Sequence, residues 1–350
     1  MHTISDIIQF DLPEKLACPE PTEIRKIARD DARLLVTNNS GSISHTTFKQ
    51  LTNHLLPGDV LVVNTSATVP AAFPVALPFG KKGVIHFSTR IDNRNWLAEI
   101  RVIKNNQTVR WKGGKAGMVF LLPGNARVRL KDKFYGNRDL LHLWTVELTI
   151  NQEAVPYMTE FGQPIKYLSL DKPYPIDYYQ TMFSSQPGSS EMPSAGRGFT
   201  AGLVDRLMQK GISFAPVLLH TGVSSLEENE APYPEYMEVE PISAAIINNA
   251  KRKGGRIIAV GTTAVRAIES AADETGLVSP FKGKTSLYIR NGYSMKTVDG
   301  LLTGFHEPKA SHLNMLQSLA GFDHMERAYT AAIENNYFWH QFGDLHLILP

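Results

Sequence analysis

The sequence has little of what marks secreted, membrane-spanning or metal-rich proteins. Its only cysteine is Cys18, which excludes a disulfide framework and a thiol-rich metal site within the chain. A single thiol is typical of a reducing compartment, so we expect a cytoplasmic protein. The first residues lack a basic stretch followed by an apolar core, and the apolar runs are far shorter than a bilayer, so neither a signal peptide nor a membrane association is predicted.

Charge of one sign is also lacking. The 36 lysines and arginines nearly balance the 34 aspartates and glutamates, which leaves a net charge of +2. This balance does not by itself indicate a nucleic-acid-binding protein, but it is compatible with a local basic face. Such a cluster, able to follow phosphates or simply solvated, is formed by Arg101, Lys104, Arg110, Lys112, Lys115, Arg127, Arg129, Lys131 and Lys133.

What the chain does have is the composition of an ordinary globular protein, with 43% hydrophobic and 20% charged residues over 350 positions. Helical and strand patterns alternate up to position 69 and again from 154, whereas 70–153 shows short strands separated by turns. We predict an α/β domain made of residues 1–69 and 154–350, with a mostly parallel sheet and crossover helices. A small β-barrel domain at 70–153 is predicted to interrupt it.

Within the α/β part the pattern predicts helices at 200–210, 242–253, 263–272 and 311–319, and strands at 31–37, 60–63, 215–220, 256–260 and 286–289. Ligands of such sheets bind beyond the carboxyl ends of the strands, so the loops there are the candidate site. The histidines show no metal-ligand spacing, and a metal enzyme is not expected.

The strand at 256–260 ends in a turn that opens a helix. Gly261, Thr262 and Thr263 form this turn, and Arg266 follows one turn later. Free backbone amides and the helix dipole favour an anion there, to which Arg266 can add a bidentate contact. A plain N-cap with Arg266 on a solvated face explains the same residues, so both interpretations stay open.

Three further segments carry candidates of weaker specificity. His220 follows a predicted strand and is either a proton acceptor or a structural histidine. Glu235 begins a run of alternating carboxylates, which can supply a base or an acidic edge. The loop at 192–200, with Ser194, Gly196 and Thr200, can wrap a ligand or be a connector capped by Thr200. Its spacing matches neither a Walker loop nor a dinucleotide fingerprint.

Short motifs occur along the chain in a fixed order. The most specific is Gly-Arg-Ile-Ile-Ala-Val-Gly-Thr-Thr-Ala-Val-Arg at 255–266, and the others stand at 10–13, 31–36, 56–64, 179–181, 194–196, 199–200, 291–293, 298–299, 305–308 and 342–344. On these motifs the chain resembles, nearly end to end, the S-adenosylmethionine:tRNA ribosyltransferase-isomerase family of queuosine biosynthesis.

The resemblance implies an α/β domain interrupted by a β-barrel. It implies transfer and isomerisation of the ribosyl part of S-adenosylmethionine onto 7-aminomethyl-7-deazaguanine at the wobble position of tRNA, and hence contact with the anticodon region. Adenine and methionine are released and epoxyqueuosine is formed. The sulfonium acidifies the adjacent carbon, so a modest base can start the reaction, and no cofactor beyond this co-substrate is expected.

The resemblance also implies roles for the residues in the matching segments. We expect His220 and Glu235 to be the candidate bases in these segments. For S-adenosylmethionine we expect contacts from Gly261, Thr262, Thr263, Arg266, Ser194, Gly196 and Thr200. For the acceptor substrate we expect Asn64, His306, Lys309 and Asp344.

The chain departs from the family's motifs at polar positions. After Asn64 the family continues Asp-Thr-Arg, where this chain has Thr65, Ser66 and Ala67. Before Phe-Thr the family has Leu-His, where this chain has Arg197 and Gly198. A carboxylate, a guanidinium and an imidazole are therefore missing. The alternative is a divergent paralogue that binds S-adenosylmethionine but acts on another acceptor or has no catalytic activity.

Overall fold

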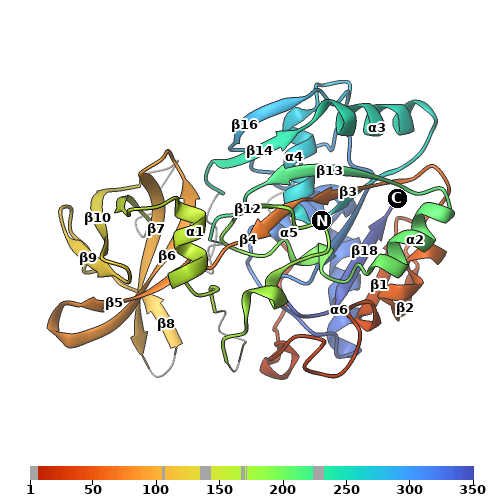
Figure 1. The fold of residues 1–350 in the computed structure, drawn as a ribbon. Coiled ribbons are helices and arrows are strands. Elements are labelled where there is room, and N and C mark those ends of the chain that lie inside the picture. The colour runs from red at the N-terminus through yellow and green to blue at the C-terminus, as the bar shows by residue number, and fades with distance from the viewer. Residues whose placement is uncertain (1–6, 105–106, 135–142, 167–169, 171, 224–231) are drawn as a thin grey trace.

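The computed structural model describes residues 7–104, 107–134, 143–166, 170, 172–223 and 232–350. They form a large sheet with helices on both faces and, beside it, a smaller barrel-like sheet (Figure 1). The large sheet has the order β16-β14-β13-β3-β15-β17-β18-β1-β2. Its strands are β1 (Arg33–Asn38), β2 (Ile43–Thr47), β3 (Val60–Asn64), β13 (Ser213–Leu219), β14 (Glu235–Val239), β15 (Ile257–Val260), β16 (Phe281–Thr285), β17 (Gly300–Gly304) and β18 (Leu345–Leu349).

The large sheet is mixed, and the prediction of a mostly parallel sheet was wrong. Parallel pairs join β13 to β3, β3 to β15, β15 to β17 and β18 to β1. The four other pairs are antiparallel. Only strands joined by long crossovers can run parallel, whereas β2 returns directly from β1 through a tight turn and must run antiparallel. The parallel centre is the part that was predicted.

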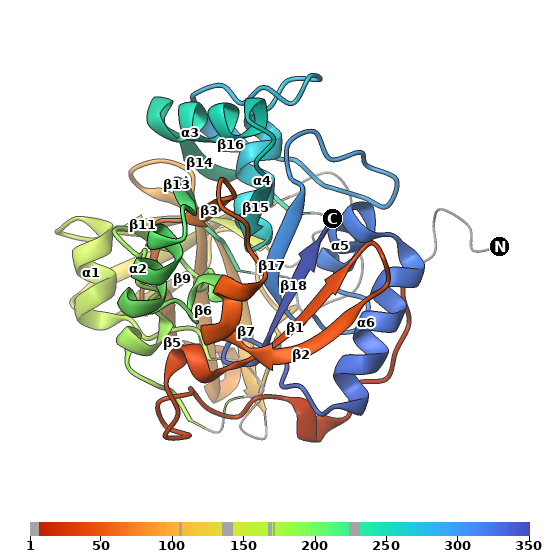
Figure 2. The ribbon, with the colours of Figure 1, turned by 90° about the vertical axis from the view of Figure 1, so that its right-hand side faces the viewer.

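Both faces of this centre are covered. In β3, Val60 and Val62 pack into the core shared with α3 to α6, whereas Leu61 and Val63 pack into the core shared with α2. This alternation is the two-residue period of a strand buried on both sides. Figure 2 shows α2 and α6 on opposite sides of the sheet. The helices are α2 (Ala201–Gln209), α3 (Pro241–Arg252), α4 (Thr262–Ala271), α5 (His312–Ala320) and α6 (Phe322–Glu334).

The smaller sheet is antiparallel throughout and closes into a near-barrel, with β5 close to β9. Its strands are β5 (Ala72–Leu77), β6 (Lys81–Arg90), β7 (Asn95–Lys104), β8 (Gln107–Arg110), β9 (Val119–Leu122), β10 (Ala126–Lys133) and β11 (Leu143–Thr149). Helix α1 (Ala154–Phe161) packs on this barrel: Tyr157 stacks on Phe73 with ring centroids 5.4 Å apart. The exact limits of the inserted domain stay a prediction.

Short elements complete the fold. Strands β4 (Ser66–Thr68) and β12 (Gln186–Ser189) pair in parallel between the large sheet and the barrel. In the described part of the chain, 3-10 turns lie at Glu14–Leu16, Arg29–Asp31, Phe48–Asn53, Pro78–Gly80, Ile176–Tyr179 and Ser194–Gly196. No helix within the described ranges combines the length and the apolar character that crossing a membrane requires.

Candidate active site

Two adjoining cavities open beyond the carboxyl ends of β15 and β17. The first, of about 210 Å³, is lined by segments 191–195, 261–263, 303–310 and 340–341, together with Thr221 and His312. The second, of about 90 Å³, is lined by segments 221–223, 287–289 and 311–312 and by Pro232, Tyr233, Glu235, Thr262, Thr263, Arg266 and Met315. The two share Thr221, Thr262, Thr263 and His312, so they meet at the start of α4.

The junction of the cavities is the turn predicted from the sequence. β15 ends at Val260, and Gly261 then adopts a φ of +90°, a left-handed conformation that glycine accepts without strain. The helix begins at Thr262, so the N–H groups of Thr262 and Thr263 have no carbonyl one turn earlier within the helix to bond. They are donors at the positive end of the helix dipole, in two residues that line both cavities.

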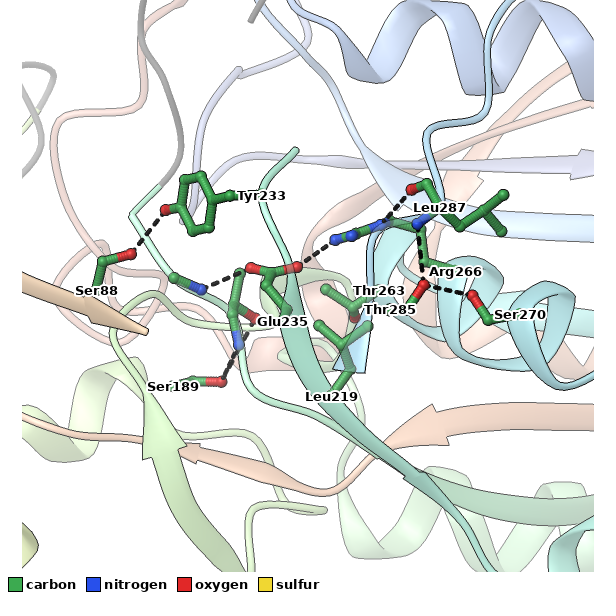
Figure 3. Close-up of polar contacts among 12 residues, drawn as sticks. Ser88, Ser189, Leu219, Tyr233, Glu235, Thr263, Arg266, Ser270, Thr285 and Leu287 are labelled. Carbon is green, nitrogen blue, oxygen red and sulfur yellow. Dashed lines mark hydrogen bonds and ion pairs between the residues drawn. The ribbon is translucent and has the colours of Figure 1, made fainter. Parts of the chain in front are cut away.

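The wall of the second cavity contains a buried ion pair (Figure 3). Glu235 at the start of β14 accepts a hydrogen bond from the Gly222 N–H at 2.7 Å, and its other oxygen pairs with Nη1 of Arg266. Arg266 also donates from Nε to the Leu287 carbonyl oxygen at 3.0 Å. Its buried Nη2 has no protein partner among the described residues. The guanidinium therefore has one donor left over beside the cavity.

The barrel reaches this wall. Ser88 of β6 hydrogen-bonds the Tyr233 hydroxyl at 2.8 Å and accepts from the Val223 N–H at 3.0 Å. Ser190, next to the first cavity, donates to the Ser88 carbonyl oxygen at 2.9 Å. Burial raises the pKa of Tyr233, so its hydroxyl stays protonated, and it donates to the Val223 carbonyl oxygen. The second cavity therefore lies next to the contact between the barrel and the large sheet.

The lining of the first cavity includes the side chains of His306, His312 and His340. The rings of His306 and His312 stack with centroids 4.5 Å apart, and Nε2 of His306 lies 3.1 Å from the Thr303 hydroxyl. Burial lowers the pKa of both, that of His306 to about 3, so both rings are neutral at pH 7. Across the cavity, Nδ1 of His340 lies 2.5 Å from Oε1 of Glu307.

Comparison with known proteins identifies the family. Residues 5–348 match the family model described as queuosine biosynthesis protein. The chain belongs to this family. It is 36% identical to a protein of Desulfitobacterium hafniense and 35% identical to one of Carboxydothermus hydrogenoformans, each named S-adenosylmethionine:tRNA ribosyltransferase-isomerase. Each comparison covers 97% of this chain and 98% of the relative.

A solved structure agrees with this assignment. The crystal structure of S-adenosylmethionine tRNA ribosyltransferase from Thermotoga maritima is similar, with a TM-score of 0.54 and 26% sequence identity. The comparison covers 97% of this chain and 99% of that one. In the described part of this family member, no group of three or more His, Cys, Asp or Glu side chains is arranged to hold a metal ion.

Several of the residues predicted from the family's motifs line the two cavities. Gly261, Ser194, His306 and Lys309 line the first, Arg266 and Glu235 line the second, and Thr262 and Thr263 line both. They come from separate segments of the chain, and the structure gathers them around one turn. Their roles in binding and catalysis stay predictions.

Other predicted residues line neither cavity and make structural contacts, although Asn64 lies directly behind the wall, where its Nδ2 donates to the Thr263 hydroxyl at 3.2 Å. Thr200 caps α2 by accepting from the Leu203 N–H. Asn64 is buried and ties the ends of β3 and β13 together through both the N–H and the carbonyl of Leu219. Asp344 accepts hydrogen bonds from the backbone N–H groups of Arg33 and Phe338, and Gly196 is buried in the 3-10 turn Ser194–Gly196.

His220 also lies outside both cavity walls. Its Nδ1 is 2.8 Å from the Ser66 hydroxyl, and its ring stacks on Tyr236 with centroids 5.7 Å apart. A Cβ at Gly188 would come within 2.5 Å of the ring, so the glycine lets the chain pass directly over it. Burial lowers the pKa of His220 to about 4. The imidazole is neutral and well packed, and its predicted role as a base stays a prediction.

Sequence reasoning did not assign several polar side chains of the first cavity to the site, among them Glu191, Thr221, His312 and His340. Thr221 and His312 border both cavities. Glu191 and His312 belong to no motif or spacing that points to chemistry. The neighbours of the other two offered a signal, because Thr221 directly follows the candidate His220 and His340 lies just before the Phe-Gly-Asp motif that was assigned to the site.

The positions at which this chain departs from its family's motifs are also placed. Thr65 and Ala67 line neither cavity, and the Thr65 hydroxyl donates to the Val217 carbonyl oxygen at 3.1 Å. Gly198 lines a smaller third cavity, of about 20 Å³, together with His340. A Cβ at Gly198 would lie 2.8 Å from Cδ1 of Phe48. A larger residue there therefore requires Phe48 to move.

Proposed function

We propose that this protein transfers and isomerises the ribosyl group of S-adenosylmethionine onto 7-aminomethyl-7-deazaguanine in tRNA. The product is epoxyqueuosine, and adenine and methionine are released. The observation that carries the proposal is the end-to-end match to relatives that bear this enzyme name, at up to 36% identity. The paired cavities support it, because a reaction between two substrates needs both of them held side by side with the reacting atoms close together.

The start of α4 is the proposed site for the amino-acid end of S-adenosylmethionine. The N–H groups of Thr262 and Thr263 suit the carboxylate of the methionine part, and the helix dipole adds to this attraction. The unpartnered Nη2 of Arg266 supplies a further donor beside the second cavity. Ser194 lies on the wall of the first cavity, where it can contact the rest of the molecule.

The chain's own part in the reaction is to orient the two substrates and to move a proton. Because the sulfonium acidifies the carbon beside it, the base needs only ordinary strength. Both oxygens of Glu235 are engaged, by Gly222 and by Arg266, which supports a positioning role for this predicted base. His220 has one ring nitrogen bonded to Ser66 and would need to act from behind the cavity wall.

The barrel is the proposed contact for tRNA, at its anticodon region. On β10, Arg127, Arg129 and Lys131 point outward at two-residue spacing, whereas the residues between them are buried. Arg101 of the predicted basic cluster is instead buried against Glu99 at 3.2 Å, so it is not part of this face. Three exposed cations along one strand are suited to phosphates.

The cellular setting and the domain limits are proposals as well. We propose that the protein acts in the cytoplasm, which is consistent with its lone, buried cysteine. We also propose that residues 70–153 form a separate folding unit, since the seven strands of the near-barrel all fall between Ala72 and Thr149.

A second candidate function is a family member that binds S-adenosylmethionine but serves another acceptor. The observation that favours it is the loss of a carboxylate, a guanidinium and an imidazole at Thr65, Ala67 and Gly198. Mass spectrometry of tRNA nucleosides separates the two candidates. With S-adenosylmethionine and tRNA that carries the precursor base, the proposed function yields epoxyqueuosine, whereas the second yields none although the ligand binds.

A further inference from the structure

We propose that His340 and Glu307 form the proton-transfer pair of this site, in which Nε2 of His340 accepts the proton and Glu307 positions the ring. The inference rests on the proposed function and names a residue for one of its steps. Both side chains line the first cavity, and Nδ1 of His340 lies 2.5 Å from Oε1 of Glu307. Neither residue was singled out by the sequence as a base.

The pair is held in place from both sides. The indole N–H of Trp339 donates to the His306 carbonyl oxygen at 3.0 Å, which joins the two segments next to the pair itself. On the other side, the Gly343 N–H donates to the His340 carbonyl oxygen at 3.0 Å, and Asp344 accepts from the Phe338 N–H at 2.8 Å. The imidazole therefore projects from a closed turn whose ends are fixed.

The backbone of His340 is strained. Its φ is +75°, in the left-handed region that costs a residue with a Cβ about 1–2 kcal/mol. Such conformations persist where the surrounding structure imposes them, and they are concentrated at functional sites. Glycine or asparagine would hold this turn with less strain, so the packing of the turn alone does not explain why a histidine stands there.

The tautomer follows from the partner. A carboxylate accepts hydrogen bonds and does not donate them, so Nδ1 of His340 carries the hydrogen of this contact. In the neutral form of the ring, Nε2 is then the nitrogen with the free lone pair. Burial acts to raise the pKa of Glu307, but the hydrogen bond from His340, together with the charge that this ring carries when it is protonated, outweighs burial and lowers the pKa to about 2. Glu307 is thus ionised at pH 7 and can stabilise the imidazolium that forms.

The proton-transfer step balances in atoms and electrons. The bond between hydrogen and the carbon next to the sulfonium breaks, and its electron pair stays on that carbon beside the positive sulfur. A new N–H bond forms at Nε2 of His340. The departing adenine needs a proton, and the imidazolium can return it, so His340 ends the cycle neutral. The contact of the His306 ring is different, because its Nε2 lies 3.1 Å from the Thr303 hydroxyl and not from a carboxylate.

The test uses His340→Gly and His340→Asn, which remove the imidazole and suit the left-handed backbone. We expect adenine release to fall by about 10²–10⁴-fold. We expect S-adenosylmethionine affinity by calorimetry to be unchanged and the thermal midpoint not to be lowered. Added imidazole should restore part of the turnover of His340→Gly. Glu307→Gln should lower kcat by a smaller factor and leave KM for S-adenosylmethionine unchanged.

The matched control is His54→Gln, a partly buried histidine outside both cavities, which should turn over like the wild type. If the wild type is active and both His340 variants keep its rate, the inference is wrong while the proposed function stands. Loss of rate together with loss of S-adenosylmethionine binding would also overturn it, because that pattern indicates a binding role. If the wild-type protein is itself inactive on tRNA that carries the precursor base, both the proposed function and this inference are wrong.

Discussion

Glu235 joins two elements of the candidate site through its two carboxylate oxygens. One accepts from the N–H of Gly222, which precedes the contact with the barrel, and the other pairs with Arg266 one turn into α4. Both charged side chains are almost completely buried, at 8% exposure for Glu235 and 9% for Arg266. The wall of the second cavity therefore depends on a buried charge pair. Removing one partner leaves the other charge buried without compensation, which strongly destabilises the fold.

We expect Glu235→Ala to lower the free energy of unfolding by about 3–5 kcal/mol, because it leaves the buried guanidinium of Arg266 without its charge partner. Glu238→Ala is the control, since Glu238 lies on the same strand but pairs with the exposed Lys282. That change should cost less than about 1 kcal/mol. Urea denaturation measures the free energy of unfolding of both variants. Equal losses would show that the buried pair contributes no more to stability than the exposed pair.

The amide of Thr262 can be removed without breaking α4, since proline is well tolerated at the first position of a helix. If this N–H binds the carboxylate of S-adenosylmethionine, Thr262→Pro should weaken binding by about 1.5–3 kcal/mol, the usual contribution of a hydrogen bond to a charged group. Thr262→Ala removes only the hydroxyl and is the control. Calorimetric titration measures the affinity of each protein for S-adenosylmethionine. Equal affinity in Thr262→Pro and wild type would show that the Thr262 N–H does not bind the carboxylate.

The buried imidazole of His220 predicts a pH dependence of stability. Burial lowers its pKa in the folded protein from 6.5 to about 4. Between these values the unfolded chain binds a proton that the folded chain does not, so stability falls as the pH falls from 6.5 towards 4. In His220→Gln the slope should be smaller by up to about 1.4 kcal/mol per pH unit. Chemical denaturation across this range would contradict this expectation if both proteins gave the same slope.

The outward face of β10 makes a prediction about tRNA. Replacing Arg127, Arg129 and Lys131 with glutamine should weaken tRNA binding and reduce the slope of log K against log salt by about 2–3, if each neutralises one phosphate. The control replaces Arg252, Lys253 and Lys284, exposed cations outside the barrel. Fluorescence anisotropy at several salt concentrations reads out both. An unchanged slope in the β10 variant would place the tRNA elsewhere.

The central strands and the turn at Gly261 were predictable because their signals are local. Four consecutive apolar residues before a Gly-Thr-Thr turn indicate a buried strand that enters a helix, and β15 and α4 have this form. The strand expected at 286–289 does not form. Its apolar residues Leu287 and Ile289 line the second cavity, and β16 lies earlier, at the polar Phe281–Thr285. Apolar character there reflects burial around a site and not a strand.

Two other features were not predicted, for different reasons. Helix α6 was not predicted, although Met325, Ala328, Tyr329 and Ala332 have helical spacing and are buried on one face, so that signal was present. The contacts between site residues that are distant in the sequence have no such local signal. Nothing in the chain says that His340 meets Glu307, 33 positions away, because the contact depends on how β17 and the segment before β18 are packed.

The central claim is that the ribosyl group of S-adenosylmethionine moves to the tRNA base. The most direct measurement incubates the wild-type protein with S-adenosylmethionine labelled in the ribose and tRNA that carries 7-aminomethyl-7-deazaguanine. Nucleosides are then analysed by mass spectrometry. We predict labelled epoxyqueuosine, with one adenine and one methionine released per product. Saturable binding of S-adenosylmethionine without any labelled nucleoside would contradict the claim and favour a family member that serves another acceptor.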